Sequence, residues 1–273
     1  MDIIDFHTHI FPDEIAERAL LRLSEHSGDY RPCTNGTLGG LLSSMEEAGI
    51  TLSVVANIAT KPSQVVPILN FCKKIKGQRI YPLISIHPRT SHAEVLEVMK
   101  EAKASGIYGV KFHPMYQEFE IDSPEMYPLY EILISEGFFA VFHTGYDIAF
   151  PENHNADLDR LAHVAGRYPE LEIVTTHLGG WRQWERIGEI AGFENIYTEI
   201  SMTLTEMSDE DFLKTLSAFN PERVFFGSDS PWADQKEMVK RVMALPLRSE
   251  LKEGMLFRNA LNFMQRYSPR FPF

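Results

Sequence analysis

Cysteine is scarce in this chain, long hydrophobic runs are absent, and basic residues are in the minority. Cys33 and Cys72 are too few for a disulfide framework. No stretch approaches the ~18–20 apolar residues that span a bilayer. The opening residues, MDIIDFHTHI, also lack the basic and apolar regions of a signal peptide. We therefore expect a cytoplasmic protein without membrane contacts.

The charge balance is strongly acidic. Asp and Glu number 38 against 26 Lys and Arg, which gives a formal net charge of −12. Such a chain repels phosphate backbones and anionic lipid, so nucleic acid is not an expected partner. The hydrophobic share of 44% and the charged share of 23% are those of an ordinary globular protein. We expect a small-molecule ligand and, as the commonest assembly, a homodimer.

Eight short runs rich in Val, Ile, Phe and Tyr recur along the chain, and each precedes a stretch with helical spacing. These predicted strands are Ile3–His9, Leu52–Ile58, Ile80–His87, Tyr108–His113, Phe138–His143, Leu171–His177, Asn195–Ser201 and Arg223–Asp229. Eight strand–helix units in series favour an α/β fold, a single (β/α)8 TIM barrel domain over residues 1–273. An open doubly wound sheet is the alternative.

Residues typical of helix starts occur between the predicted strands. Ser91, Ser123 and Ser208 each stand where a capped helix would begin. The interval 10–51, after the first strand, is longer than one helix needs. We expect an extra segment there, a loop or helix over the barrel mouth that serves as a lid.

Polar residues gather at the ends of the predicted strands. Six of the ten histidines and one aspartate stand there: His7, His9, His87, His113, His143, His177 and Asp229. Active sites of such barrels are built at the carboxyl ends of the strands. We therefore expect these side chains to meet at the barrel mouth.

The first strand offers two metal ligands. Side chains two apart on a strand point the same way, so His7 and His9 can reach one ion. Asp229 follows an apolar run, where a carboxylate must be paired or metal-bound. Imidazoles with one carboxylate form a catalytic zinc-type site. The alternative for His7 and His9 is a partly exposed strand end, and for His143 or His177 alone it is a hydrogen-bonded core residue.

Lys111 and His113 share one face of the fourth strand. Three roles fit Lys111: binding an anionic group of the substrate, carrying a carbamate between two metals, or pairing with a carboxylate such as Glu199. His113 fits a site role and a structural hydrogen bond equally. Tyr116, Trp181 and Trp232 flank these motifs and offer flat walls to a substrate, although packing is the commoner use of such tryptophans.

Six stretches together resemble a known superfamily. They are DFHTHIFP at 5–12, GVKFHP at 109–114, VFHTGYD at 141–147, THLGGW at 176–181, GSDSPW at 227–232 and RNALNFM at 258–264. In this order they resemble the amidohydrolase superfamily, and within it the "amidohydrolase 2" branch. That branch includes the aminocarboxymuconate semialdehyde and γ-resorcylate decarboxylases alongside hydrolases. The resemblance implies a distorted barrel of the amidohydrolase type.

The resemblance also implies roles for residues. His7, His9, His143 and Asp229 fall on the family's metal ligands, and His177 falls on an acid/base or water-orienting position. One divalent ion, most often zinc, is the expected cofactor. Lys111 stands where many hydrolases of the superfamily have glutamate, so a carboxylated lysine and a second metal stay open. Some members of the branch function without metal.

Two reactions fit this set of residues. In the first, Asp229 takes a proton from metal-activated water and His177 stabilises the developing charge, which predicts hydrolysis of a small, carboxylate-bearing molecule. In the second, the same site removes carbon dioxide without oxidation. A degenerate barrel that binds a ligand without catalysis is the alternative from another class, and a metal-dependent deoxyribonuclease is disfavoured by Lys111 and the net charge.

Overall fold

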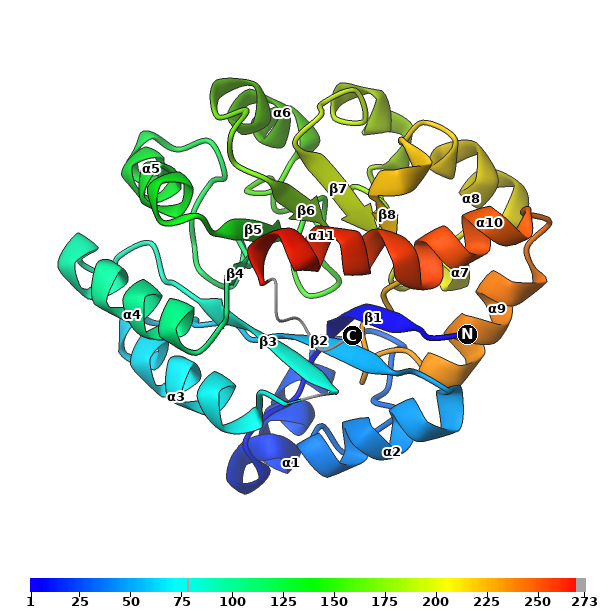
Figure 1. The fold of residues 1–273 in the computed structure, drawn as a ribbon, viewed down its shortest axis with the longest axis horizontal. Coiled ribbons are helices and arrows are strands. Elements are labelled where there is room, and N and C mark those ends of the chain that lie inside the picture. The colour runs from blue at the N-terminus through cyan, green and yellow to red at the C-terminus, as the bar shows by residue number, and fades with distance from the viewer. Residues whose placement is uncertain (78, 269–273) are drawn as a thin grey trace.

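A computed structural model describes residues 1–77 and 79–268, and its eight strands form one parallel sheet in sequential order (Figure 1). The strands are β1 (Ile4–Thr8), β2 (Leu52–Ala56), β3 (Ile80–Ser85), β4 (Gly109–Phe112), β5 (Phe139–Phe142), β6 (Ile173–Thr175), β7 (Ile196–Glu199) and β8 (Val224–Phe225). All their residues are buried, as expected for a parallel sheet covered by helices. The eight predicted strands are confirmed in number and order.

Backbone hydrogen bonds close the sheet into a barrel. The N–H of Phe6 donates to the carbonyl of Phe226 at 2.8 Å, and the N–H of Asp229 donates to the carbonyl of His7, also at 2.8 Å. A third bond joins His9 to Ser230. The first strand therefore lies beside the segment that follows the last, and the open doubly wound alternative is wrong.

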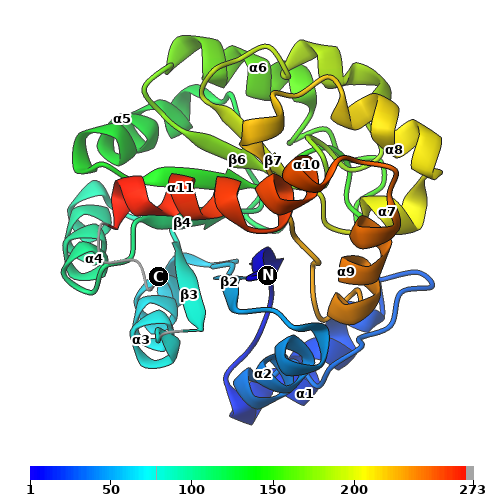
Figure 2. The ribbon, with the colours of Figure 1, turned by 45° about the vertical axis from the view of Figure 1, so that its right-hand side comes forward.

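Helices surround the barrel (Figures 1 and 2). The outer helices include α3 (Val65–Ile75), α4 (His92–Ala104), α5 (Tyr127–Glu136), α6 (Leu158–Arg167), α7 (Thr203–Glu206), α8 (Asp209–Leu216) and α9 (Gln235–Ala244), with short 3-10 turns at Pro62–Gln64, Pro124–Met126, Trp184–Glu189 and Pro221–Arg223. Ser91 and Ser208 accept capping bonds from backbone N–H groups, as predicted. Ser123 makes no such bond, and it precedes the Pro124–Met126 turn that leads into α5.

The predicted extra segment after the first strand contains two helices, α1 (Asp13–Ser24) and α2 (Leu38–Ala48). Figure 2 shows them together below α9, which contacts α2. Between the helices the chain returns to the barrel mouth, where the N–H of Cys33 donates to the carbonyl of Pro231 at 2.7 Å. The extra segment is thus anchored near Asp229.

The C-terminal helix plugs the end of the barrel opposite the histidines. After α10 (Ser249–Glu253) and a π-helical turn (Gly254–Arg258), α11 (Asn259–Tyr267) crosses in front of the strands in Figure 1. The Phe263 ring lies 4.9 Å from Phe139, 4.7 Å from Tyr197 and 5.4 Å from Phe225 between centroids. This aromatic cluster fills the barrel interior, so the polar residues are left to the other end.

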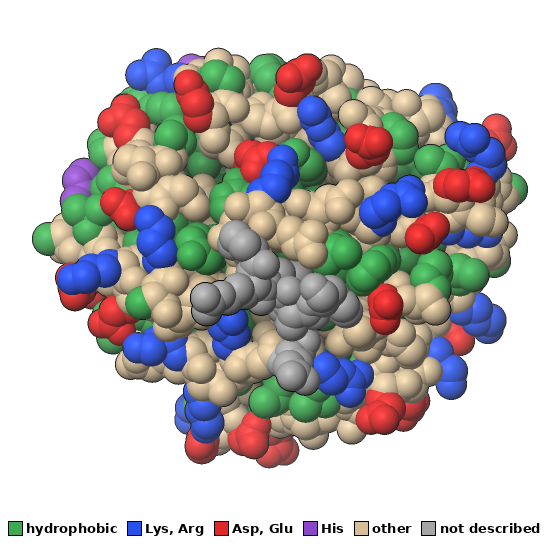
Figure 3. All heavy atoms as spheres, in the orientation of Figure 1, with side chains coloured by type: hydrophobic (Ala, Val, Ile, Leu, Met, Phe, Trp, Pro, Cys, Tyr) green, Lys and Arg blue, Asp and Glu red, His purple; other side chains and the backbone are tan. Residues whose placement is uncertain are grey.

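On the outer face seen in Figure 3, acidic and basic side chains are interspersed over the helices. No helix among residues 1–77 and 79–268 has both the length and the apolar character required to cross a membrane.

Candidate metal centre

The observed strands end earlier than predicted, so most candidate site residues begin the loops. His7 lies within β1, and His9, His113 and His143 directly follow β1, β4 and β5. His177 and Asp229 lie further beyond β6 and β8, and both have left-handed backbone, with φ of 57° and 68°, which a strand does not contain.

Left-handed backbone is concentrated at this end of the barrel. The six non-glycine residues with positive φ in the described part of the chain all lie in loops after β4, β6, β7 and β8: Glu118, His177, Leu178, Arg182, Met202 and Asp229. Such conformations cost free energy and persist where the surrounding structure imposes them, typically at functional sites. Residues with strained backbone and the polar candidate residues therefore lie in the same loops.

Three side chains converge on one point. Nε2 of His7 lies 3.0 Å from Nε2 of His9, and Oδ1 of Asp229 lies 3.1 Å from His9 and 3.7 Å from His7. Oδ1 of Asp229 is buried and makes no hydrogen bond of regular geometry. The register of β1 shifts between Asp5 and Thr8, the stretch that contains His7, while Phe6 packs in the barrel interior.

The other ring nitrogens determine the tautomers. Nδ1 of His9 lies 2.7 Å from the carbonyl of Ala56, and Nδ1 of His7 lies 2.9 Å from a carboxylate oxygen of Glu199. Because these oxygens accept, each Nδ1 carries the proton and each Nε2 presents a lone pair. Two lone pairs and a carboxylate oxygen then face one another, an arrangement that a cation stabilises.

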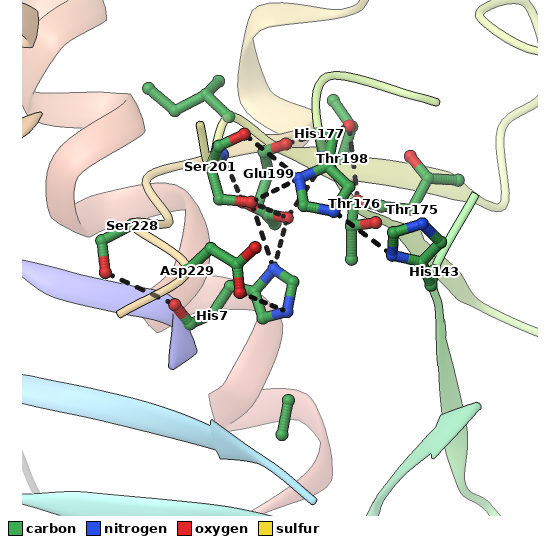
Figure 4. Close-up of polar contacts among 12 residues, drawn as sticks. His7, His143, Thr175, Thr176, His177, Thr198, Glu199, Ser201, Ser228 and Asp229 are labelled. Carbon is green, nitrogen blue, oxygen red and sulfur yellow. Dashed lines mark hydrogen bonds and ion pairs between the residues drawn. The ribbon is translucent and has the colours of Figure 1, made fainter. Parts of the chain in front are cut away.

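His143 and His177 continue the pattern (Figure 4). Nε2 of His143 donates to the carbonyl of Tyr146 at 2.8 Å, and Nδ1 of His177 lies 3.2 Å from the carbonyl of Ser201. Their remaining nitrogens, Nδ1 of His143 and Nε2 of His177, are 3.3 Å apart. His177 also groups with His7 and Asp229, all ligand atoms within 4.8 Å. His143 therefore adjoins the centre through His177.

Burial sets the protonation states. It lowers the pKa of His7, His143 and His177, and the nearby Lys111 charge lowers the first further. Burial alone would raise the pKa of Asp229, but the histidines around it, His7 foremost, lower it overall. Neutral imidazoles beside an ionised carboxylate are the forms that bind a metal.

The donor set fits a divalent metal. Zinc binds imidazole nitrogen at ~2.0–2.1 Å, which places tetrahedral ligands ~3.4 Å apart. The separations among His7, His9 and Asp229 bracket that value. Each imidazole also donates its second N–H to a carbonyl or carboxylate, as metal-bound histidines do.

Lys111 lies inside the centre rather than at its rim. Its side chain is fully buried and its Nζ lies 3.5 Å from Nε2 of His7. Burial lowers the pKa of Lys111 to about 8. Glu199, weighed above as its ion-pair partner, is bound instead by His7 and Ser201.

A second group of ligand-type side chains lies beside the first. Nε2 of His113 and Nε2 of His143 lie 3.4 Å and 3.6 Å from Oδ2 of Asp147, and the two imidazoles stack at 4.2 Å. Nδ1 of His113 is buried without a hydrogen bond. Asp147 was not singled out from the sequence, although it closes the VFHTGYD motif.

The predicted aromatic walls differ in their contacts. Tyr116 sets its ring edge-on to His113 at 4.6 Å, and Trp181 lies 5.3 Å from His177. Trp181 is only 2% exposed. Trp232 packs against the hydrophobic core.

Comparison with known proteins places the chain in a family. The amidohydrolase family model matches residues 4–264, and these span the strands and loops that carry the candidate ligands. The chain belongs to the amidohydrolase family. No curated protein matches it.

Solved structures share the fold of this amidohydrolase. An uncharacterized TIM-barrel protein from Bordetella bronchiseptica is 22% identical, with a TM-score of 0.81 over 98% of this chain and 99% of that one. A 5-carboxyvanillate decarboxylase from Novosphingobium aromaticivorans with bound manganese is 12% identical (TM-score 0.72, 96% and 97% covered). A probable 2-pyrone-4,6-dicarboxylic acid hydrolase from Acinetobacter baumannii is 15% identical (TM-score 0.65, 97% and 99% covered).

Proposed function

We propose that this amidohydrolase is a metal-dependent hydrolase of a small, carboxylate-bearing molecule. The observation that carries the proposal is the convergence of Nε2 of His7, Nε2 of His9 and Oδ1 of Asp229 within 3.7 Å of one another. The ligand set proposed is His7, His9, His143 and Asp229.

The residues of the centre divide the chemistry between them. A divalent ion held there lowers the pKa of its water toward ~7 and polarises a substrate carbonyl. Asp229 accepts the proton that the water loses as the new carbon–oxygen bond forms, and it returns that proton to the leaving group. His177, neutral and next to Asp229, directs its Nδ1–H to the Ser201 carbonyl, so its Nε2 accepts the hydrogen bond that orients the water.

Zinc is the proposed ion, because imidazole nitrogens with one carboxylate are its usual catalytic ligands. Manganese suits the same mixed set, and the Novosphingobium decarboxylase contains it. A carbamate on Lys111 that bridges to a second metal is the less favoured arrangement.

Substrate recognition is assigned to Lys111, His113, Tyr116, Trp181 and Trp232. The buried ammonium of Lys111 and the free Nδ1 of His113 are placed to bind a carboxylate and a hydroxyl or water, respectively. The ring of Tyr116 lies edge-on to His113, and the ring of Trp181 lies against His177. These rings favour a flat substrate.

A substrate screen in oxygen-18 water tests the proposal. Metal-loaded protein is incubated with small lactones and amides that bear a carboxylate, and the products are analysed by mass spectrometry. We expect oxygen-18 in one product, and Asp229→Asn should lower turnover at least ~100-fold while the far-ultraviolet circular dichroism is unchanged. Turnover without oxygen-18 would overturn the hydrolase proposal.

Non-oxidative decarboxylation is the second candidate. The fold similarity to the manganese-containing 5-carboxyvanillate decarboxylase favours it. Carbon dioxide release from a small aromatic or unsaturated acid, without oxygen-18 incorporation, would establish it in place of hydrolysis. A metal-loaded chain that binds such acids and transforms none would instead be a binding module.

A further inference from the structure

A buried carboxylate from β7 lies behind the metal centre. Glu199 is fully buried, and Figure 4 shows it between His7, His177 and Ser201. The sequence suggested Glu199 only as an ion-pair partner of Lys111, and its contacts with the histidines are seen in the structure alone.

All the groups that Glu199 contacts are hydrogen-bond donors. Oε1 accepts from Nδ1 of His7 at 2.9 Å, from the backbone N–H of His177 at 3.1 Å and from Oγ of Ser201 at 2.8 Å. Oε2 accepts from the backbone N–H of Ser201 at 2.6 Å. Four donors and no acceptor match an ionised carboxylate and disfavour an amide, whose NH2 group would face an N–H.

Ser201 extends the network to the second histidine. Its Oγ lies 2.9 Å from Nδ1 of His177 and donates to Glu199. The carboxylate therefore binds the β1 histidine through its ring, and the β6 histidine through its backbone and through Ser201. The backbone bond falls on the left-handed turn at His177, which holds that residue out of the strand.

Space for this carboxylate comes from a glycine after β8. A Cβ atom at Gly227 would lie 2.1 Å from Oε2 of Glu199 and 3.2 Å from Cβ of His7. Any larger residue at 227 would displace one of the two. The absence of a side chain at Gly227 therefore leaves space for Glu199 beside His7.

From these contacts we infer that Glu199 is a positioning residue: it holds His7 in the Nδ1–H tautomer, so that His7 presents Nε2 to the metal, and it fixes His177 beside His7. The tautomer assignment stands on the contacts of Glu199 alone, whereas its consequence for metal binding and turnover rests on the proposed function. Carboxylates that bind the far nitrogen of a metal-bound histidine raise metal affinity 10–100-fold.

Long-range proton–nitrogen NMR of nitrogen-15-histidine-labelled protein tests the tautomer directly. In metal-free native protein we expect His7 as the Nδ1–H form, identified by the signal that disappears in His7→Ala. Glu199→Gln should lose that form at His7. Ser201→Ala, which leaves Glu199 in contact with His7, should keep it. Glu172→Gln, in which the altered carboxylate bonds to Tyr197 and Tyr267 away from the centre, is the matched control.

Metal affinity supplies the second readout. Zinc is titrated against a chromophoric chelator, and we expect Glu199→Gln to weaken binding 10–100-fold while Glu172→Gln has no effect. Gly227→Ala keeps the carboxylate but displaces it, because the new Cβ would lie 2.1 Å from Oε2 of Glu199. This variant should therefore also weaken zinc binding. Retention of the native His7 tautomer and native zinc affinity in folded Glu199→Gln would overturn the inference.

The two proposals fail separately. If no substrate is turned over, the proposed hydrolase is lost, but the His7 tautomer and its dependence on Glu199 are still measured in the metal-free chain. If turnover is found and Glu199→Gln lowers neither kcat nor zinc affinity, the hydrolase stands and the positioning role is lost.

Discussion

Asp5 and Ser228 are joined by a hydrogen bond of 2.5 Å from Oγ to Oδ2, although 223 residues separate them in the chain. The same carboxylate accepts bonds from the backbone N–H of Ser228, from Gln235 and from the backbone N–H of His7. The strand that carries His7 is therefore tied to the residue that precedes Asp229. These hydrogen bonds link the two parts of the candidate metal centre.

Replacing Asp5 tests that tie. Asp5→Asn leaves an amide among four donors, and we expect the free energy of unfolding to fall by about 1–3 kcal/mol, the cost of leaving buried hydrogen-bonding groups unsatisfied. Urea denaturation of the metal-free protein measures the change. Asp29→Asn, at an exposed position, should leave the midpoint in place. Equal stability of the two variants would contradict the role given to Asp5.

Lys111 is expected to destabilise the metal-free protein at neutral pH. Its pKa of about 8 in the folded chain, against 10.5 as its ordinary value, corresponds to a cost of about 3 kcal/mol. The penalty is complete below pH 8 and disappears as pH rises from 8 to 10.5, because only the unfolded chain still binds the proton there. Lys111→Met should therefore be the more stable protein at pH 7.

Urea denaturation from pH 7 to pH 10 measures this pH dependence. The stability advantage of Lys111→Met over the native chain should narrow as pH rises. The exposed Lys100→Met serves as the control and should show a flat difference. If the stability difference between Lys111→Met and the native chain did not change over this pH range, the lowered pKa of Lys111 would be refuted.

Phe263 anchors the opposite end of the barrel. Its ring contacts aromatic side chains from β5, β7 and β8, so Phe263→Ala should cost about 3–5 kcal/mol. Thermal unfolding measures this loss, and Phe263→Leu should lose less. Zinc binding per folded chain should be unchanged, since the metal centre lies at the other end. Loss of zinc in folded Phe263→Ala would show that the two ends are coupled.

The barrel was predictable because its strands are buried on both faces, which leaves continuous runs of Val, Ile and Phe between polar segments. The placement of His7, His9 and Asp229 followed from alternation along one strand and from the order of strand ends. Lys111 was placed on the correct strand, but its depth beside His7 depends on packing that no local pattern encodes.

Other features depend on contacts between distant segments. His177 and Asp229 have left-handed backbone in the loops after β6 and β8, and neither residue type predicts this conformation as glycine would. The ring orientation of His143 is set by the carbonyl of Tyr146, and the role of Glu199 is set by β1 and β6. Tertiary structure creates these relationships, so they were not available from spacing alone.

Metal content per chain tests whether His7, His9 and Asp229 form a metal centre. The native chain, purified without chelators and then incubated with zinc or manganese, is analysed by elemental mass spectrometry alongside His9→Ala and Asp229→Asn. We expect at least one divalent ion per native chain, with affinity reduced or lost in both variants. A native chain that binds neither metal, or variants that bind as tightly as the native chain, would rule out this metal centre.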